Sequence, residues 1–348
     1  MQCVLEVLRG QAGSRIVDEA EWTSALDLAR EEHVEPMVVE RLLQSGVPLP
    51  DAVLERVLAA RRDATITAFF WSSQLTSLLK EFAEAGIDLI PLKGPSLAER
   101  VYGGAALRAC RDLDLLVRKS DYAAAESLLT RLGFTAAARP DDYHRQWGRA
   151  TATVELHFDV ENPLAIDFQI ADAWERSRPN LFNGRPCRLL APEDELLFLC
   201  IHGVRHRFER LSLTLDIAMA LSRMPGISPR TDLDRLIQLG SAMARHLNPE
   251  LNVTVAIAQM QQLADQLWGE LMQAPQPTLD WQMQHAFYLE TELTSASRLR
   301  RRMAHLRIAL TRLIEPDFAF AARFGMQRPW QVWLLRPIRL VFARTRKK

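Results

Sequence analysis

The sequence predicts an α+β protein in which a small sheet with its own helices lies between two helical regions. Apolar residues recur at three- and four-residue spacing up to residue 85 and again after residue 191, as in amphipathic helices. Between these regions, short apolar or alternating segments are separated by helical ones, which is typical of a sheet-containing core. We therefore expect an N-terminal helical region at 1–85, a core at 86–190, and a C-terminal helical domain with a basic tail at 191–348.

The periodicity also predicts the individual elements. A glycine or a capping residue stands at several of the expected ends, including Gly86 and Ser120. Strands are expected at 87–92, 113–117, 134–138, 151–159 and 185–190, and helices at 20–43, 51–85, 121–132, 193–209, 211–223, 230–245, 249–273 and 279–314.

Composition places the chain among ordinary globular proteins. Its 348 residues are 48% hydrophobic and 25% charged. The most apolar run, residues 195–204, is too short to span a bilayer, and no signal-peptide pattern opens the chain, so we expect a cytoplasmic protein. The four cysteines form no CxxC pair, which argues against a structural zinc site of the usual spacing and favours buried free thiols.

Charge is unevenly distributed along the chain. The net charge is zero, but fourteen Lys and Arg stand against two acidic residues from residue 298 to the C-terminus. This basic tail can contact a phosphate-bearing partner or dock on the acidic remainder of the protein. Its Trp and Phe residues interleave with arginines, which suits nucleic-acid stacking or a membrane surface as well as packing onto the body.

Two aspartates mark the expected strand at 113–117. Residues two apart in a strand face the same side, so Asp112 and Asp114 project together while Leu113 and Leu115 face the core. Two such carboxylates can coordinate Mg²⁺, with Mn²⁺ as an alternative, and metal ions can bridge a triphosphate. A solvated strand face would also produce this pattern.

A second acidic strand follows. Glu155, His157 and Asp159 alternate with apolar residues in the segment 151–159 and therefore share one face. If this strand lies beside the first, Glu155 completes a cluster of three carboxylates that binds a catalytic metal or accepts a proton from a hydroxyl. Three close negative charges are costly unless a cation neutralises them. Without such a neighbour, this face is simply solvated.

A turn after the first expected strand has the composition of a phosphate-binding loop. Gly94 lets the backbone approach a phosphate, the following helix offers free N–H groups, and Lys93 and Ser96 add a cation and a hydroxyl. A plain strand-to-helix turn explains the same residues.

Histidines follow the core. His202 and His206 share one face of the helix expected at 193–209, and Arg210 continues that row. They can contact nucleotide or acceptor, support the domain junction, or, with further ligands, bind zinc. Asp216 lies in an apolar run, so we expect it to pair with a basic group such as Arg210 or a histidine.

These segments together resemble a known family. The resemblance is to the uncharacterised bacterial nucleotidyltransferases of the DNA polymerase β superfamily. The segments that carry it are Leu92-Lys93-Gly94, Tyr102, Arg108, the run from Arg111 to Val117, Gly133-Phe134, the run from Val154 to His157, and the segments at 199–211, 216–218 and 335–340. The resemblance covers about residues 15–342. It implies a mixed sheet, the acids Asp112, Asp114 and Glu155, Mg²⁺, and a nucleoside triphosphate. The expected nucleotide contacts are then Lys93, Gly94, Ser96, Arg111, His157, His202, His206 and Arg210.

The expected function is therefore transfer of a nucleoside monophosphate to an acceptor, with release of pyrophosphate. Two alternatives stand beside it: a nucleotide-binding module without turnover, which the complete acid set argues against, and an RNA-directed nucleotide-adding enzyme, favoured only by the basic tail. Because the rest of the chain is acidic, we expect the acceptor to be a small molecule, peptide or protein rather than nucleic acid.

Overall fold

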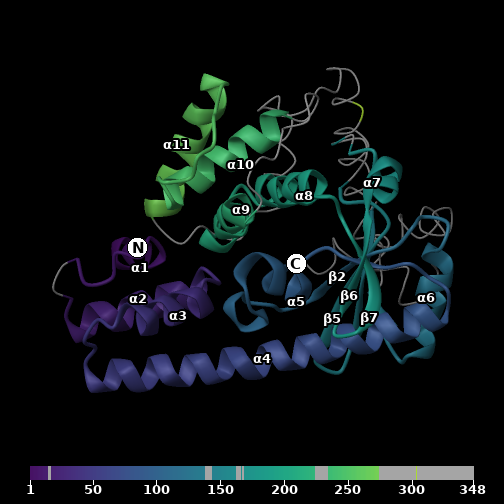
Figure 1. Ribbon diagram of the computed structural model, residues 1–348, viewed down its shortest axis with the longest axis horizontal. Coiled ribbons are helices and arrows are strands. Elements are labelled where there is room, and N and C mark those ends of the chain that lie inside the picture. Colours follow the sequence, from purple (N-terminus) through teal and green to yellow (C-terminus); the bar gives the residue numbers. More distant parts are fainter. Residues whose placement is uncertain are drawn as a thin grey trace, which may run out of the picture.

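The computed structural model describes residues 1–14, 17–137, 143–161, 166, 168–223, 234–273 and 303 (Figure 1). The helix predicted at 279–314 lies outside the described residues except for Met303, and the basic tail beyond it lies wholly outside them. Among the described helices, none combines the length and the apolar character that crossing a bilayer requires.

The predicted mixed sheet is confirmed. In the described part of the chain it has five strands in the order β1-β2-β5-β4-β3, and β2 and β5 run parallel while the other neighbours are antiparallel. A separate hairpin, β6-β7, continues beyond β1, where the Arg188 N–H donates to the Leu89 carbonyl. The strands are β1 (Ile90–Pro91), β2 (Leu113–Leu116), β3 (Thr135–Ala136), β4 (His144–Arg149), β5 (Ala152–His157), β6 (Arg178–Phe182) and β7 (Arg185–Leu189).

Helices surround this sheet on two sides. Figure 1 shows the long helix α4 running beneath the N-terminal helices and the sheet, with α8 to α11 on the opposite side and α5 between. The helices are α1 (Gln2–Leu8), α2 (Glu19–Glu31), α3 (Glu35–Ser45), α4 (Asp51–Glu84), α5 (Gly94–Leu97), α6 (Tyr122–Arg131), α7 (Ile170–Arg176), α8 (Pro192–Arg205), α9 (Leu211–Arg223), α10 (Asp234–Leu247) and α11 (Ala258–Gln273), with a π-helical turn η1 (Ala98–Tyr102) and a 3₁₀ turn η2 (Ala105–Leu107).

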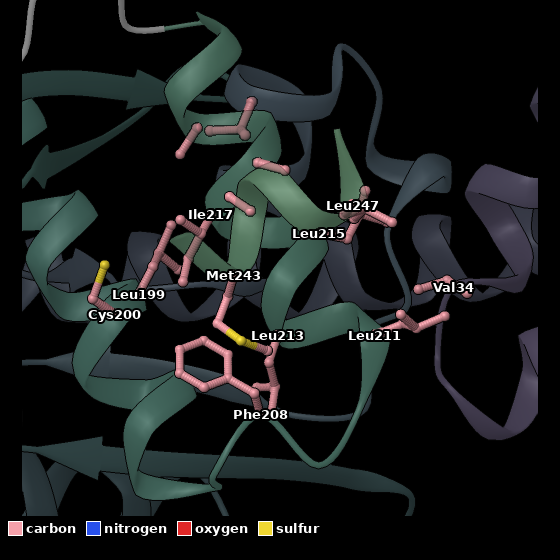
Figure 2. Close-up of a cluster of buried hydrophobic side chains, with 14 of the residues drawn as sticks. Val34, Leu199, Cys200, Phe208, Leu211, Leu213, Leu215, Ile217, Met243 and Leu247 are labelled. Carbon is pink, nitrogen blue, oxygen red and sulfur yellow. The ribbon is translucent and has the colours of Figure 1, made fainter. Parts of the chain in front are cut away.

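Two hydrophobic cores lie on the two faces of the sheet. Leu113 and Leu115 of β2 pack with Trp71, Leu75 and Phe82 of α4 in one core. The other core holds the N-terminal helices together with α8 to α11 (Figure 2). Alternation along β2 therefore directs its leucines toward α4 and leaves the aspartate face toward α8, as predicted.

The N-terminal and C-terminal helices are joined by capping contacts. The Glu32 carboxylate, at the turn between α2 and α3, accepts from the backbone N–H of Leu211 at 2.7 Å, at the start of α9. Arg9 donates to the carbonyls of His246 and Leu247 at 2.6 and 3.1 Å, at the end of α10. Each contact satisfies helix-end groups that have no partner within their own helix.

Some elements differ from the sequence prediction. The hairpin partner strands β4 and β6 and helix α7 were not predicted, and β1 is shorter than the apolar run at 87–92. Helix α8 ends at Arg205 rather than at residue 209, because Arg207 and Phe208 adopt left-handed backbone angles (φ of 48° and 53°). This turn folds the Phe208 ring back onto α8, where it is fully buried.

That close approach predicts the effect of one methyl group. A Cβ atom on Gly203 would lie 2.4 Å from the Phe208 ring, whereas one on Gly269 in α11 would meet nothing within 4 Å. We expect Gly203→Ala to lower the free energy of unfolding by about 1–3 kcal/mol, because the packed ring must move. Gly269→Ala should be neutral or stabilising by up to about 1 kcal/mol, because alanine favours helix. Urea unfolding checks both, and an equal loss in the two variants would contradict this packing.

Candidate active site

Two carboxylates meet on neighbouring strands at the face turned toward α8. In the parallel pairing of β2 with β5, Asp114 stands opposite Glu155, and Leu115 opposite Leu156. The period of two along each strand brings both acids to the same side of the sheet. Asp114 is almost fully buried, and the Glu155 side chain keeps 20% of its surface exposed. The edge of this acidic pair thus remains open to a ligand.

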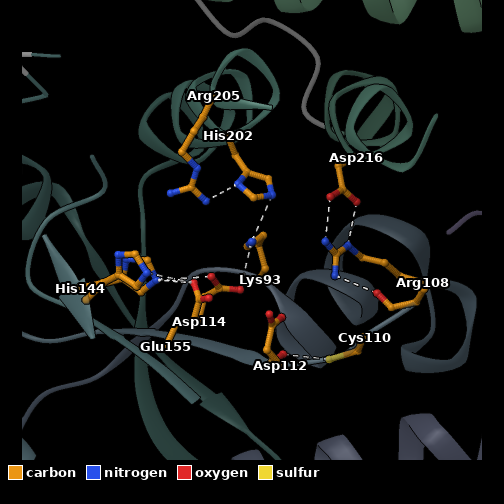
Figure 3. Close-up of polar contacts among 12 residues, drawn as sticks. Lys93, Arg108, Cys110, Asp112, Asp114, His144, Glu155, His202, Arg205 and Asp216 are labelled. Atoms are coloured by element: carbon orange, nitrogen blue, oxygen red, sulfur yellow. Dashed lines mark hydrogen bonds and ion pairs between the residues drawn. The ribbon is translucent and has the colours of Figure 1, made fainter. Parts of the chain in front are cut away.

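His157 adds a nitrogen donor to the pair. Its Nε2 lies 3.4 Å from Asp114 Oδ1 and 3.5 Å from Glu155 Oε2. One ligand atom from each of these three residues falls within 4.8 Å of the others, a spacing that can hold a metal ion. His144 stacks on His157 with ring centroids 4.8 Å apart and lies 3.7 Å from Glu155 Oε2 (Figure 3). His144 and its strand β4 were absent from the sequence prediction.

Lys93 supplies the nearest positive charge. Its Nζ lies 3.1 Å from Asp114 Oδ2 and 3.3 Å from His202 Nε2 (Figure 3). The backbone positions it, because the N–H of the preceding residue, Leu92, donates to the Asp114 carbonyl at 2.9 Å. One ammonium group therefore bridges the sheet and helix α8.

These contacts explain the protonation of the cluster. Burial disfavours the charged form of Asp114, but the charge of Lys93 and the neighbouring His157 outweigh it and lower the pKa of this carboxyl. The pKa of Glu155 is also lowered, since His157 overcomes the effect of burial. The pKa of His157 is raised, because the two carboxylates outweigh its burial. Without a metal, the Lys93 ammonium neutralises part of the charge of the pair, and the raised pKa of His157 favours its protonated form.

Asp112 lies two residues before Asp114, at the entry to β2. Figure 3 shows its carboxylate directed to the same side as Lys93 and Asp114. Among the described residues, the group whose ligand atoms lie within 4.8 Å of one another does not include Asp112. Burial and the negative charge of Asp114 raise the pKa of Asp112 to about 6, although Lys93 opposes the shift. Asp112 is thus close enough for its pKa to respond to the charge of Asp114, although it lies outside the cluster of Asp114, Glu155 and His157.

The expected phosphate loop is built around Gly94. Its φ of 67° is a left-handed angle, and a Cβ there would meet Leu113 Cδ2 at 3.4 Å and Cys110 Sγ at 3.6 Å. Glycine therefore lets the chain turn directly against the entry to β2. Ser96 is 2% exposed, so its hydroxyl is withdrawn from solvent.

Helix α8 brings His202 and His206 to this region. His202 contacts Lys93 through Nε2 and the Arg205 guanidinium through Nδ1, at 2.9 Å. Burial, together with the charges of Lys93 and Arg205, holds the pKa of His202 well below its usual value. His206 packs edge-on against His202 with ring centroids 4.9 Å apart, and its Nδ1 lies 3.5 Å from Glu209. His202 therefore faces the acids, while His206 lies behind it.

Arg210 does not continue this row, contrary to the sequence prediction. Helix α8 has already ended, and Arg210 turns toward the N-terminal helices, where its Nη1 donates to the Glu31 carbonyl at 2.7 Å. The same atom lies 3.0 Å from His33 Nε2. Arg111 reaches the same imidazole nitrogen at 3.0 Å from its own Nη1. Arg111 and Arg210 thus meet at His33, a residue that the sequence analysis did not select.

The partner of Asp216 also differs from the prediction. Neither Arg210 nor a histidine pairs with it. Arg108 donates to both oxygens of Asp216 at 2.7 and 2.8 Å, and the Tyr102 hydroxyl donates at 2.6 Å. The sequence pointed to Tyr102 and Arg108 only through the family resemblance and not as partners of Asp216. This buried, bidentate pair ties the loop before β2 to helix α9 (Figure 3).

Comparison with known proteins identifies the family. A family model described as uncharacterised nucleotidyltransferase matches residues 18–269. The chain belongs to this family. The resemblance inferred from the sequence motifs is thereby confirmed over these residues, and the match includes the sheet, the acid cluster, helices α8 to α10 and most of α11. No protein among the functionally curated ones matches the chain.

Solved structures of nucleotidyltransferases are also similar to parts of this nucleotidyltransferase. An antigenic nucleotidyltransferase-like protein from Paracoccidioides brasiliensis is 16% identical, with a TM-score of 0.39 over 56% of this chain and 92% of its own. ANT(2″)-Ia in complex with adenylyl-2″-tobramycin is 15% identical, with a TM-score of 0.31 over 57% of this chain and 97% of its own.

The raised pKa of Asp112 predicts a pH-dependent stability in the metal-free protein. Because the folded state binds this proton more tightly than the unfolded state, the contribution of Asp112 to stability falls as pH rises from about 4 through 6. In the presence of a chelator, Asp112→Asn should therefore be more stable than the wild type at pH 8, by about 1–3 kcal/mol, with the difference shrinking toward pH 4. Asp88→Asn, at an exposed position, should show no such trend. If Asp112→Asn is less stable than the wild type at pH 8, burial and the charge of Asp114 do not destabilise the ionised Asp112 carboxylate.

The Arg108–Asp216 pair predicts an asymmetric mutational response. Arg108→Ala leaves a 4% exposed carboxylate without its cation and should cost about 3–5 kcal/mol of unfolding free energy. Replacing both residues with leucine should cost less, because no lone charge remains buried. Denaturant unfolding of Arg108→Leu, Asp216→Leu and the double leucine variant, together with Arg108→Ala, tests this. If the double variant loses as much as the sum of the two single variants, the pair is not coupled.

Proposed function

We propose that this nucleotidyltransferase moves a nucleoside monophosphate from a nucleoside triphosphate to an acceptor and releases pyrophosphate. The observation that carries the proposal is the pairing of Asp114 with Glu155 on adjacent parallel strands, with Asp112 two residues before. Family membership supports the reaction class. An intact and partly accessible acid set favours an active enzyme over a silent nucleotide-binding module.

The donor set fits a divalent cation. Asp112, Asp114 and Glu155 offer hard carboxylate oxygens, which suit Mg²⁺, and the nitrogen of His157 also accommodates Mn²⁺. When bound at such acids, divalent ions neutralise the charge that develops on the transferring phosphoryl group and align it with the attacking oxygen.

Lys93 and His202 would face the phosphates. In the metal-free protein the Lys93 ammonium neutralises Asp114 at 3.1 Å. A divalent cation held by the acids would take over that neutralisation and leave the ammonium to bind a phosphate oxygen. His202 lies between Lys93 and Arg205 on the side of α8 and, as a neutral imidazole with one acceptor nitrogen, can accept a hydrogen bond from one of them. Gly94 brings the backbone against this edge of the sheet.

The acceptor would approach from the open side of Glu155. With its lowered pKa, this carboxylate is ionised at neutral pH and can accept the proton of an attacking hydroxyl. We propose a small molecule, peptide or protein as the acceptor, because the chain before the basic tail is strongly acidic. A triphosphate donor is consistent with action in the cytoplasm.

Loss of either paired acid should abolish both metal binding and transfer. We expect Asp114→Asn and Glu155→Gln to weaken Mn²⁺ binding, followed by the paramagnetic signal of the free ion, by at least about tenfold, because each removes an anionic ligand. Pyrophosphate release from ATP, GTP, CTP or UTP, supplied with pooled metabolites or peptides, should fall roughly a hundredfold or more.

A matched variant separates this effect from a general change in charge. Glu84→Gln removes one exposed carboxylate at the end of α4 and should leave both measurements unchanged. Thermal unfolding of each variant verifies that the fold survives. Wild-type metal affinity and turnover in a folded Asp114→Asn variant would refute the proposed site.

A further inference from the structure

Two arginines from distant parts of the chain converge on one imidazole at the turn between α2 and α3. Arg111 precedes the first aspartate, and Arg210 follows helix α8, yet the Nη1 atoms of both lie 3.0 Å from His33 Nε2. His33 itself comes from the turn between α2 and α3. Arg111 and Arg210 lie 78 and 177 residues after His33 in the sequence, so three distant segments of the chain meet at this point.

The imidazole cannot satisfy both cations. Burial and the charges of Arg210 and Arg111 lower the pKa of His33 to about 4, so its ring is neutral at physiological pH. A neutral imidazole has one acceptor nitrogen, and here both guanidinium groups address the same atom. Among the residues that the structure describes, neither arginine forms an ion pair with a carboxylate within 4.0 Å. Two positive charges thus stand together without an ion pair of their own, although the Glu32 carboxylate interacts with Arg210 at longer range.

The surrounding structure holds this arrangement in place. His33 has a left-handed backbone (φ 58°), and the neighbouring Glu32 carboxylate is engaged by the N–H of Leu211. Arg210 is anchored by the carbonyl of Glu31 at 2.7 Å, which leaves part of its guanidinium free to bind. Arg111 is exposed to solvent, so a ligand can reach the cluster. Two preorganised guanidinium groups match the oxygens of a phosphate.

We propose that Arg111, Arg210 and His33 form a phosphate-binding site that serves the acid cluster. This inference rests on the proposed function for its role, but the binding itself is independent of metal and of turnover. Arg111 directly precedes Asp112 in the chain, so the segment that leads into β2 carries one residue of each site. The bound phosphate belongs either to the distal end of the triphosphate or to a phosphorylated acceptor.

Pyrophosphate, titrated by calorimetry in the presence of a chelator, is the probe. We expect the wild type to bind it and Arg111→Gln to weaken binding by at least about tenfold, because a charge-assisted contact is lost. Arg210→Gln should act in the same direction. Arg111 is exposed, so its variant should fold normally, and thermal unfolding checks this. Arg131→Gln, an exposed arginine at the end of α6, is the matched control and should bind like the wild type.

Asp114→Asn separates this site from the proposed reaction. It should retain pyrophosphate binding without metal even though it lacks transfer, because it lies outside the arginine cluster. Absence of pyrophosphate binding by the wild type, or wild-type affinity in both arginine variants, would overturn the proposal whether or not the protein transfers nucleotides.

Nucleotide titrations identify the source of the phosphate. If the triphosphate supplies it, Arg111→Gln should weaken ATP binding far more than AMP binding. If the acceptor supplies it, the variant should bind both nucleotides normally and lose pyrophosphate binding measured with saturating AMP. Either outcome supports the phosphate site.

Discussion

The juxtaposition of two carboxylates on parallel strands is the constraint from which the site is built. Asp114 and Glu155 are held opposite each other by the sheet register, and Asp114 is almost fully buried, so it cannot turn away into solvent. Unit charges at about 4 Å interact by roughly 4 kcal/mol at the effective dielectric of a protein surface. Cations must therefore lie within reach, and the structure supplies them through Lys93 and His157. The metal-free protein is in this sense already arranged for a positive ligand.

Helix α8 can stay close to this charged face because other ion pairs hold it there. Asp194 and Glu195, in its first turn, are buried and receive bidentate contacts from Arg176 and Arg100. Breaking either contact would leave a buried charge uncompensated. The geometry at His202 thus depends on contacts about two helical turns away from it. These pairs, together with the Arg108–Asp216 contact, attach the C-terminal helices to the sheet and its connecting turns.

The sequence could predict the parts of this site that follow from local periodicity. Alternation within β2 and β5 predicted that the acids share one face and the leucines the other, and the strand register places Asp114 opposite Glu155. It could not locate the partner of Asp216, because Arg108 lies 108 residues earlier and no periodic pattern connects them. The row through Arg210 was wrong for a similar reason. The burial of Phe208 against Gly203 ends α8 early, and this packing is a tertiary effect that overrides helical spacing.

His33 shows why the N-terminal helices belong to the same functional unit. Taken alone, it is one histidine between two helices, and contacts of Glu31 and Glu32 with Arg210 and the start of α9 hold it beside Arg210. The acid cluster attracts cations, and the arginine cluster attracts anions. The two clusters are connected in the sequence, because Arg111 of the arginine cluster directly precedes Asp112. A substrate that matches both must carry a metal-bound group and a second negative group a short distance away. A nucleoside triphosphate meets this requirement unaided, and a nucleoside monophosphate meets it only beside a phosphorylated acceptor. The charge pattern therefore restricts the set of ligands before any acceptor is known.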